Sequence, residues 1–381
     1  MLEPTRRTKR FALSMGLGIV LAFGVPPMAA WSEPDHVLTT IPLGSGQLAV
    51  PSGVAVSPDG RYVYVSLPFA SSVAVIESAT NSVIATVAVG LGANFVAISP
   101  NGTLAYVTNL SADTVSVIST STNVVTHTIA VGDAPRQIAF SPDGSRAYVG
   151  NQLGDTVSVI DTATNTVTAT IAAGDGPYGL AITPDGSRIY VANLNGNTVT
   201  VIQTSNNAVI GTITSIPSAS GVTVTPDGAT VYVTSRTPSS VKVIATATNT
   251  VTATTSVGVN PLGVAVSPSG NEIAVANNSS TSISFISTAT NAVTRTISVG
   301  SGPEQVAYNS AGTRVYVTNF DSNSVSVIAS PVQASGQQSG ASAPDVATLA
   351  KTGSPDFSIV ALTILGLLLS GGMTLLGRRV L

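Results

Sequence analysis

Residues 137–172 read QIAFSPDGSRAYVGNQLGDTVSVIDTATNTVTATIA, and this stretch decides the fold. Runs rich in β-branched residues predict short strands, here spanning Gln137–Ser141, Arg146–Val149, Thr156–Asp161 and Thr166–Ala172. Pro142-Asp143-Gly144 predicts a tight turn after the first run, because proline fixes φ and glycine accepts a positive φ. Asn165 predicts a turn before the fourth run, since Asn side chains close turns. We therefore expect a four-stranded antiparallel sheet.

The same unit recurs along the chain with a constant step of 42 residues. Its first turn stands at Pro58-Asp59-Gly60, Pro100-Asn101-Gly102, Pro142-Asp143-Gly144, Pro184-Asp185-Gly186, Pro226-Asp227-Gly228, Pro268-Ser269-Gly270 and, in degenerate form, Ser310-Ala311-Gly312. A second block, complete as Tyr106-Val107-Thr108-Asn109 and Tyr316-Val317-Thr318-Asn319, keeps the same step. Four-stranded repeats of roughly 40–45 residues are typical of propeller blades. Residues 33–330 are therefore predicted to form an all-β, seven-bladed β-propeller of four-stranded antiparallel blades.

The two ends of the repeat region predict how the ring closes. The seventh copy has only three strands before the chain reaches Ser330-Pro331. The missing fourth strand is found at the other end, where residues 37–44 align with residues 125–132 of the second copy. We expect this N-terminal strand to complete the last blade, with Pro42 tolerated because an outermost strand can lack one ladder donor. Closure would also hide the sheet edges of the ring.

Residues 1–32 have the pattern of a secretory signal peptide, with basic residues at 6–10 and a mostly apolar run at 11–23. Ala30-Trp31-Ser32 predicts cleavage before Glu33, and cleavage after Ala30 is the alternative. An uncleaved membrane anchor is less favoured, because the apolar run is shorter than the roughly 20 residues that a spanning helix needs. The protein is therefore expected to be exported.

The C-terminal end predicts a tether to the cell envelope. Residues 331–348 are rich in Ser, Gly, Ala, Gln and Pro, which predicts a flexible spacer. Residues 349–381 contain an apolar run at 357–377 that is long enough for a transmembrane helix. The terminal Arg378-Arg379 pair would lie inside the cell and would keep the body of the protein outside.

The pentapeptide Leu349-Ala350-Lys351-Thr352-Gly353 precedes this run. It resembles the cell-wall sorting signal of Gram-positive bacteria in its Leu-Ala-x-Thr-Gly form, with Ala350 where the common signal has Pro. The resemblance implies two partners, a sortase that forms an acyl bond to Thr352 and releases Gly353, and the cell-wall peptidoglycan. A plain single-pass anchor is the alternative, and both interpretations predict an extracellular, wall-anchored or membrane-anchored protein.

The Tyr-Val-Thr-Asn block resembles the YVTN family of β-propeller repeats found in bacterial and archaeal surface proteins. The resemblance covers about residues 36–329 and implies the propeller fold and an extracytoplasmic setting. Members of that family include surface-layer-like proteins, and the wider class of propellers includes lactonases and lyases. We interpret the Tyr and Asn of the block as packing and turn residues.

Composition excludes several kinds of chemistry. The chain has no Cys and only two His, His36 and His127, which we place on outer strands away from the channel. The formal net charge is −3, and charged residues make up 9% of the chain, which argues against nucleic-acid binding. The repeated aspartates Asp59, Asp143, Asp185 and Asp227 are explained by turn formation. We therefore expect no metal, no cofactor and no catalytic residues, and a monomer.

One position in the repeat changes its chemistry in almost every copy. This position directly follows the residue with which each innermost strand is expected to begin. We call the seven residues at this position the channel-mouth ring: Ser52, Asn94, Arg136, Tyr178, Ser220, Leu262 and Glu304. A structural requirement would repeat from blade to blade, whereas a ligand-binding position would vary. We therefore expect these residues to bind a ligand at the mouth of the channel. Drift in an exposed loop is the alternative.

The sequence predicts a surface-displayed propeller that serves as a binding, adhesion or structural module for a protein or glycan ligand. A lactonase-like or lyase-like enzyme on the same scaffold is the alternative function, because fold alone does not decide function. An enzyme would need at least two converging His, Asp or Glu side chains in the ring, and the ring supplies only Glu304.

Overall fold

The computed structural model describes residues 36–330, which form 28 strands and one short 3₁₀ helix. Within this range no helix is long and apolar enough to cross a membrane. The predicted signal peptide, spacer, sorting signal and C-terminal transmembrane helix lie outside the described residues and stay predictions.

The strands form seven four-stranded sheets, numbered here as blades in chain order. Blade 1 holds β2 (Val54–Val56), β3 (Tyr62–Leu67), β4 (Ser72–Glu77) and β5 (Ser82–Ala88), and blade 2 holds β6 (Ala93–Ile98), β7 (Leu104–Asn109), β8 (Thr114–Ser119) and β9 (Val124–Ala130). Blade 3 holds β10 (Pro135–Phe140), β11 (Arg146–Asn151), β12 (Thr156–Asp161) and β13 (Thr166–Ala172), and blade 4 holds β14 (Pro177–Ile182), β15 (Arg188–Asn193), β16 (Thr198–Gln203) and β17 (Ala208–Ile213). Blade 5 holds β18 (Ala219–Val224), β19 (Thr230–Ser235), β20 (Ser240–Ala245) and β21 (Thr250–Ser256), and blade 6 holds β22 (Pro261–Val266), β23 (Glu272–Asn277), β24 (Ser282–Ser287) and β25 (Val293–Ser298). Blade 7 holds β26 (Pro303–Tyr308), β27 (Arg314–Asn319), β28 (Ser324–Ala329) and β1 (Val37–Pro42), and the helix η1 (Gln47–Ala49) lies between β1 and β2.

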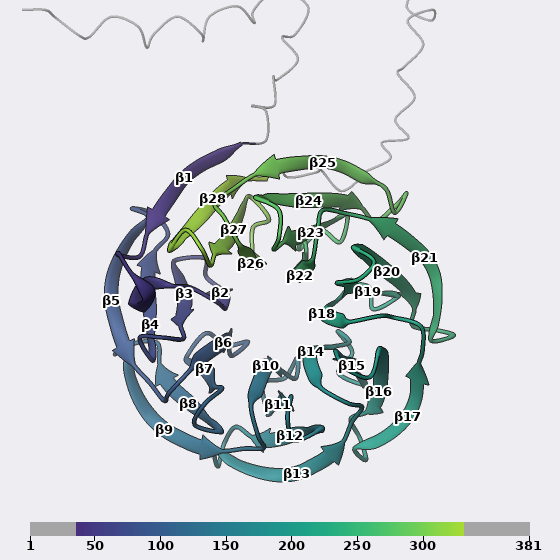
Figure 1. Cartoon of the computed structure of the whole chain (residues 1–381). Helices are drawn as coiled ribbons and strands as arrows, with labels where there is room; N and C mark the ends of the chain where they lie inside the picture. The colour runs from purple at the N-terminus through teal and green to yellow at the C-terminus, as the bar shows by residue number, and fades with distance from the viewer. Residues whose placement is uncertain (1–35, 331–381) are drawn as a thin grey trace, which may run out of the picture. The chain divides into compact units, whose positions relative to one another are not determined.

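The blades are arranged radially around a central channel (Figure 1). The first strand of each blade lies beside the channel, and β1, β5, β9, β13, β17, β21 and β25 form the outer wall (Figure 1). All pairings within the blades are antiparallel. In blade 3, for example, β11 pairs with β12 so that Tyr148 stands opposite Val159. The predicted all-β, seven-bladed propeller is confirmed.

The N-terminal strand closes the ring as predicted. β1 pairs antiparallel with β28, with Val37 opposite Ile328 and Ile41 opposite Val325. The pairing continues past the strand, because the amide of Leu43 donates to the carbonyl of Asn323 at 3.0 Å. Ile41 is buried in the core between blades 7 and 1. The two ends of the propeller are therefore joined within one sheet.

A repeated tyrosine links neighbouring blades. The hydroxyl of Tyr190 in blade 4 donates to the side-chain oxygen of Asn249 in the last turn of blade 5, at 2.7 Å. Equivalent pairs are Tyr64 with Asn123 at 3.4 Å, Tyr106 with Asn165 at 2.6 Å, and Tyr232 with Asn291 at 2.8 Å. These tyrosines are fully buried, and the asparagines adopt positive φ, which Asn tolerates better than most residues. The packing role expected for this Tyr and the turn role expected for Asn165 are thus observed. The Asn of the same block, such as Asn109, donates to the side chains of Thr114 and Ser116 at 2.9 Å and so closes the turn before the third strand.

Blade 6 carries Ala274 where the other blades carry this tyrosine. The next blade is closed by β1, so it has no turn between its last two strands and offers no asparagine to a tyrosine of blade 6. Phe285 stands directly opposite Ala274 in the sheet and is fully buried. A second contact joins blades 6 and 7, because the hydroxyl of Tyr308 donates to Glu272 at 2.9 Å and Glu272 is paired with Arg295. The exception in the repeat therefore follows from ring closure.

Candidate functional site

The channel-mouth ring lies where the innermost strands begin. Asn94, Arg136, Tyr178, Ser220, Leu262 and Glu304 are the second residues of their strands, and Ser52 precedes β2. All are buried except Arg136, which is half-buried. The ring residues are therefore part of the packed centre of the propeller, and their role in binding a ligand stays a prediction.

Hydrogen bonds join three ring residues across the point where the ring closes. The hydroxyl of Ser52 donates to a carboxylate oxygen of Glu304 at 2.8 Å. The side-chain amide of Asn94 donates to the same Ser52 hydroxyl at 3.3 Å. These contacts connect blades 7, 1 and 2, which lie next to one another around the channel (Figure 1).

Arg136 extends this network to blades 3 and 4. Its Nη1 donates to the side-chain oxygen of Asn94 at 3.2 Å, and its Nε donates to the side-chain oxygen of Gln152 at 2.6 Å. The guanidinium carbon lies 5.0 Å from the ring centroid of Tyr178, within the range of a cation–π contact. One continuous series of contacts therefore runs through five neighbouring blades, from Glu304 to Tyr178.

Sequence reasoning missed three charged or polar residues of this site. Gln152, Arg236 and Asp321 lie on the loops between the second and third strands of blades 3, 5 and 7. Nε of Arg236 donates to the side-chain oxygen of Asn260 at 2.8 Å, and its positive charge acts on both Glu304 and Tyr178. Aligning these loops across the seven copies would have revealed Gln152 and Arg236, because their position reads Pro68, Leu110, Gln152, Leu194, Arg236, Asn278 and Phe320. Asp321 stands one position later, where the copies read Phe69, Ser111, Leu153, Asn195, Thr237, Ser279 and Asp321.

Burial gives the carboxyl group of Glu304 an unusual affinity for protons. Removal from water raises the pKa of Glu304 to about 7, although the Ser52 hydrogen bond and the charges of Arg136 and Arg236 lower it. The negative charge of Asp321 raises it further. At neutral pH this carboxyl group therefore exists in both protonation states, as a general acid–base group requires.

The two arginines of the site are held by amide side chains. Neither guanidinium forms an ion pair with a carboxylate in the part of the chain that the structure describes. Their charges are oriented without being neutralised, so an anion or a developing negative charge would be stabilised beside them.

Tyr178 and Phe95 form an aromatic pair next to this polar network. Tyr178 is 6% exposed, and its hydroxyl has no hydrogen-bond partner among residues 36–330. Burial also raises the pKa of Tyr178, so its hydroxyl stays protonated and can donate a hydrogen bond. The rings of Phe95 and Tyr178 meet edge to face with centroids 6.1 Å apart. Of the remaining ring members, Ser220 bonds to Thr234 at 2.9 Å and Leu262 is apolar.

The other candidate chemistry lies elsewhere, as the sequence predicted. Asp143 accepts hydrogen bonds from the Ser141 hydroxyl at 2.5 Å and the Ser145 amide at 3.0 Å, and these bonds lower its pKa to about 2. His127 is exposed on the outermost strand β9, and His36 directly precedes β1. Within the described range, no three His, Asp or Glu side chains lie together as ligands of a metal ion would.

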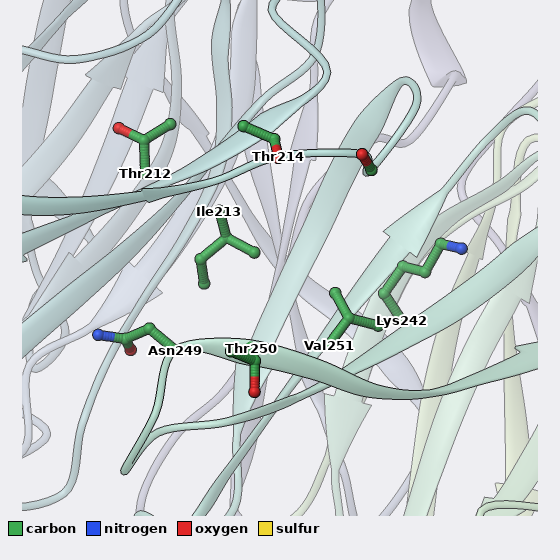
Figure 2. Close-up of a pocket in the computed structure, with 8 residues that line it drawn as sticks. Thr212, Ile213, Thr214, Lys242, Asn249, Thr250 and Val251 are labelled. Carbon is green, nitrogen blue, oxygen red and sulfur yellow. The ribbon is translucent and has the colours of Figure 1, made fainter.

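A groove of about 470 Å³ lies on the outer wall between blades 4 and 5 (Figure 2). Its lining includes Thr212, Ile213, Asn249, Val251 and Lys242, and Nζ of Lys242 bonds to Thr254 at 3.2 Å. No carboxylate is among the residues that line it. The channel mouth is therefore the better candidate for chemistry.

A family model for the seven-bladed β-propeller lactonases matches residues 90–171 and 162–292, which is more than half of the chain. The chain belongs to this family. Membership in the lactonase propeller family agrees with the wider propeller class that the sequence suggested, whereas the YVTN assignment stays a prediction. No curated protein matches the chain.

The lactonase-family propeller is also similar to a solved structure titled Kuenenia stuttgartiensis Hydrazine Synthase. The TM-score is 0.71 at 25% sequence identity, and the match covers 76% of this chain and 98% of the other. The two comparisons agree better with the alternative, a lactonase-like or lyase-like enzyme, than with a binding, adhesion or structural module.

Proposed function

We propose that this propeller is an enzyme of the lactonase type that hydrolyses a lactone or another carboxylic ester at the channel mouth. The observation that carries the proposal is the buried carboxyl group of Glu304, whose pKa is raised to about 7 and which lies in one network with Arg136. Buried groups with strongly shifted pKa values are concentrated at functional sites. Family membership supports the same reaction class.

In this proposal Glu304 moves the protons of the reaction. Its carboxylate form removes a proton from a water molecule while the water oxygen forms a bond to the carbonyl carbon of the ester. The carbonyl oxygen becomes negatively charged in the resulting tetrahedral intermediate. When the carbon–oxygen bond to the alcohol part breaks, protonated Glu304 returns the proton to the departing oxygen. Ser52 positions the carboxyl group through its 2.8 Å hydrogen bond.

Arg136 and Tyr178 are suited to stabilise the negative oxygen. The guanidinium of Arg136 is fixed by Asn94 and Gln152, so it needs little reorganisation when charge develops. The hydroxyl of Tyr178 is a free donor within the described residues, and the aromatic ring that carries it lies against the same guanidinium. Arg236 adds a second positive charge that acts on Glu304.

A ligand-binding module without catalysis is the second candidate. The same oriented arginines would bind an anionic group of a protein or glycan, and the predicted export and anchoring would display the propeller at the cell surface. The raised pKa of Glu304 favours the enzyme, because a binding site for an anion gains nothing from a buried carboxyl group that ionises near neutral pH.

The test is a panel of five- and six-membered lactones and p-nitrophenyl acetate, with acid release followed in a pH-stat. We expect turnover of at least one compound and a loss of about 100-fold or more in kcat for Glu304→Gln. Glu77→Gln is the matched control, because Glu77 lies on β4, outside the channel. The proposal fails if no compound is hydrolysed, or if Glu304→Gln hydrolyses as fast as the Glu77→Gln control.

A further inference from the structure

Several large apolar side chains lie close together on the loops of blades 7, 1 and 2. Leu48 is 65% exposed, Phe69 is 55% exposed and Leu91 is 65% exposed. The ring of Phe69 also meets that of Phe320 edge to face, with centroids 6.3 Å apart. We refer to Leu48, Phe69, Leu91 and Phe320 as the apolar rim.

Hydrogen bonds hold the loops of the apolar rim together. The loop that carries Phe320 is tied to the loop that carries Leu48, because Asn323 donates from its side chain to the carbonyl of Gly46 at 3.2 Å. The loop that carries Phe69 is tied to the loop that carries Leu91, because the amide of Val89 donates to the carbonyl of Ser71 at 2.9 Å. The Phe69–Phe320 contact joins the two pairs of loops into one surface.

The propeller scaffold does not require these apolar side chains. In five of the six other blades the position of Phe69 is polar, as Ser111, Asn195, Thr237, Ser279 and Asp321, and the sixth carries Leu153. The position of Leu91 is polar in three other copies, as Asp133, Asp175 and Ser301, and reads Pro217 and Val259 in two more. Polar residues therefore suffice for the fold at both positions.

The apolar rim lies on the loops of blades 7, 1 and 2, which also supply Glu304, Ser52 and Asn94. The arginines of the site come from blades 3 and 5, farther around the channel (Figure 1). A molecule that spans the mouth would therefore meet cationic groups on one side and apolar side chains on the other.

We propose that the apolar rim binds an apolar acyl or aryl substituent of the ester or lactone that this site hydrolyses. The inference rests on the proposed function and adds the substrate class, an amphiphilic ester. A protein partner fits less well, because a stable interface buries about 800 Å² on each partner and would extend over the loops around blade 3, which carry the acidic residues Asp133, Asp155 and Asp175. A chain of about eight carbons, by contrast, can bind to a surface made of only a few side chains.

The first measurement is binding of sodium octanoate and sodium butyrate to the full-length protein by isothermal titration calorimetry. Each fully buried methylene group strengthens binding roughly fourfold, so octanoate should bind at least about tenfold more tightly than butyrate. Phe69→Ser should remove most of this difference. Leu153→Ser should retain it, because Leu153 occupies the same repeat position in blade 3, away from the apolar rim, and is 74% exposed.

The second measurement is the ratio of kcat/KM for p-nitrophenyl octanoate to that for p-nitrophenyl acetate. This ratio should fall about fivefold or more in Phe69→Ser and stay as in the wild type in Leu153→Ser. Octanoate can bind more tightly than butyrate through Phe69 even if no ester is hydrolysed. In that case the proposed reaction is wrong, but the apolar rim is still supported as a binding site for apolar chains. If octanoate binds no more tightly than butyrate, or if both variants lose the difference equally, the inference is overturned.

Discussion

The hydroxyl of Ser52 lies 2.8 Å from a carboxylate oxygen of Glu304, although 252 positions separate the two residues in the chain. Ser52 begins the first blade and Glu304 belongs to the last, so their hydrogen bond forms only when the ring closes. Closure of the propeller and assembly of the candidate site are therefore the same structural event. The pairing of β1 with β28 that closes the propeller therefore also brings Glu304 next to Ser52.

Replacing Ser52 should change the proton affinity of Glu304. The Ser52 hydroxyl donates to the charged form of the carboxyl group and lowers its pKa, so Ser52→Ala should raise the pKa of Glu304 by about one unit. Carbon-13 NMR of glutamate carboxyl groups over a pH titration would measure the shift. Ser158→Ala is the control, because Ser158 is buried on β12 and bonds to Asn151. Equal titration curves for Ser52→Ala and Ser158→Ala would contradict the role of Ser52.

The contacts between tyrosine and asparagine should contribute measurably to stability. Tyr190→Phe removes the 2.7 Å hydrogen bond to Asn249 and should lower the free energy of unfolding by about 1 kcal/mol. Tyr148→Phe is the matched control, because the equivalent Asn207 oxygen in the next blade has no hydrogen-bond partner. Its effect in urea denaturation should stay below about 0.3 kcal/mol. Equal losses in both variants would show that the hydrogen bond is not the cause.

Most of the fold could be predicted from the sequence because the repeat is so regular. The predicted limits of the third and fourth strands of blade 3 match β12 and β13, whereas β10 begins at Pro135, two residues before the predicted start. That extension exists because Pro135 pairs with Asn151 across a bulge. The sequence shows that Ala274 replaces the repeated tyrosine. The replacement could be explained only from the structure, in which β1 closes blade 7.

The members of the candidate site could be predicted in part, and their contacts could not. Variation at one repeat position identified Glu304 and Arg136, but it placed no side chain against another. Burial of the ring residues depends on how closely the innermost strands of neighbouring blades approach one another, and the local sequence does not determine this distance. A Cβ atom on Gly179, for example, would lie only 1.9 Å from the carbonyl oxygen of Ser220 in the next blade. Arg236 and Asp321 were missed because their loops were not aligned across the repeats.

Removing the closing strand should destabilise the whole ring. A variant that lacks residues 33–43 loses the pairing of β1 with β28 and the burial of Ile41. At roughly 0.5–1.5 kcal/mol for each hydrogen bond, the loss reaches several kcal/mol, and the bare edge of β28 favours aggregation. A variant that ends at Ser330 should stay soluble and folded. Unchanged melting temperature and solubility on removal of residues 33–43 would contradict the contribution of β1.

The predicted sorting signal has a direct test in the native host. If Thr352 is the acyl donor for a sortase, Thr352→Ala should leave the protein in the membrane fraction, from which detergent releases it. The wild-type protein should be released only when the cell wall is digested. Release of both proteins by detergent alone would favour a plain membrane anchor.

The most direct test of the account is the pH dependence of kcat/KM for ester hydrolysis. A general base acts in its deprotonated form, and burial raises the pKa of Glu304 to about 7, so the wild-type rate should rise with pH and level off above about pH 8. Glu304→Gln should lose this rise together with most of the activity. A wild-type profile that levels off near pH 5, or the same rise in Glu304→Gln, would contradict the assignment of Glu304 as the acid–base group.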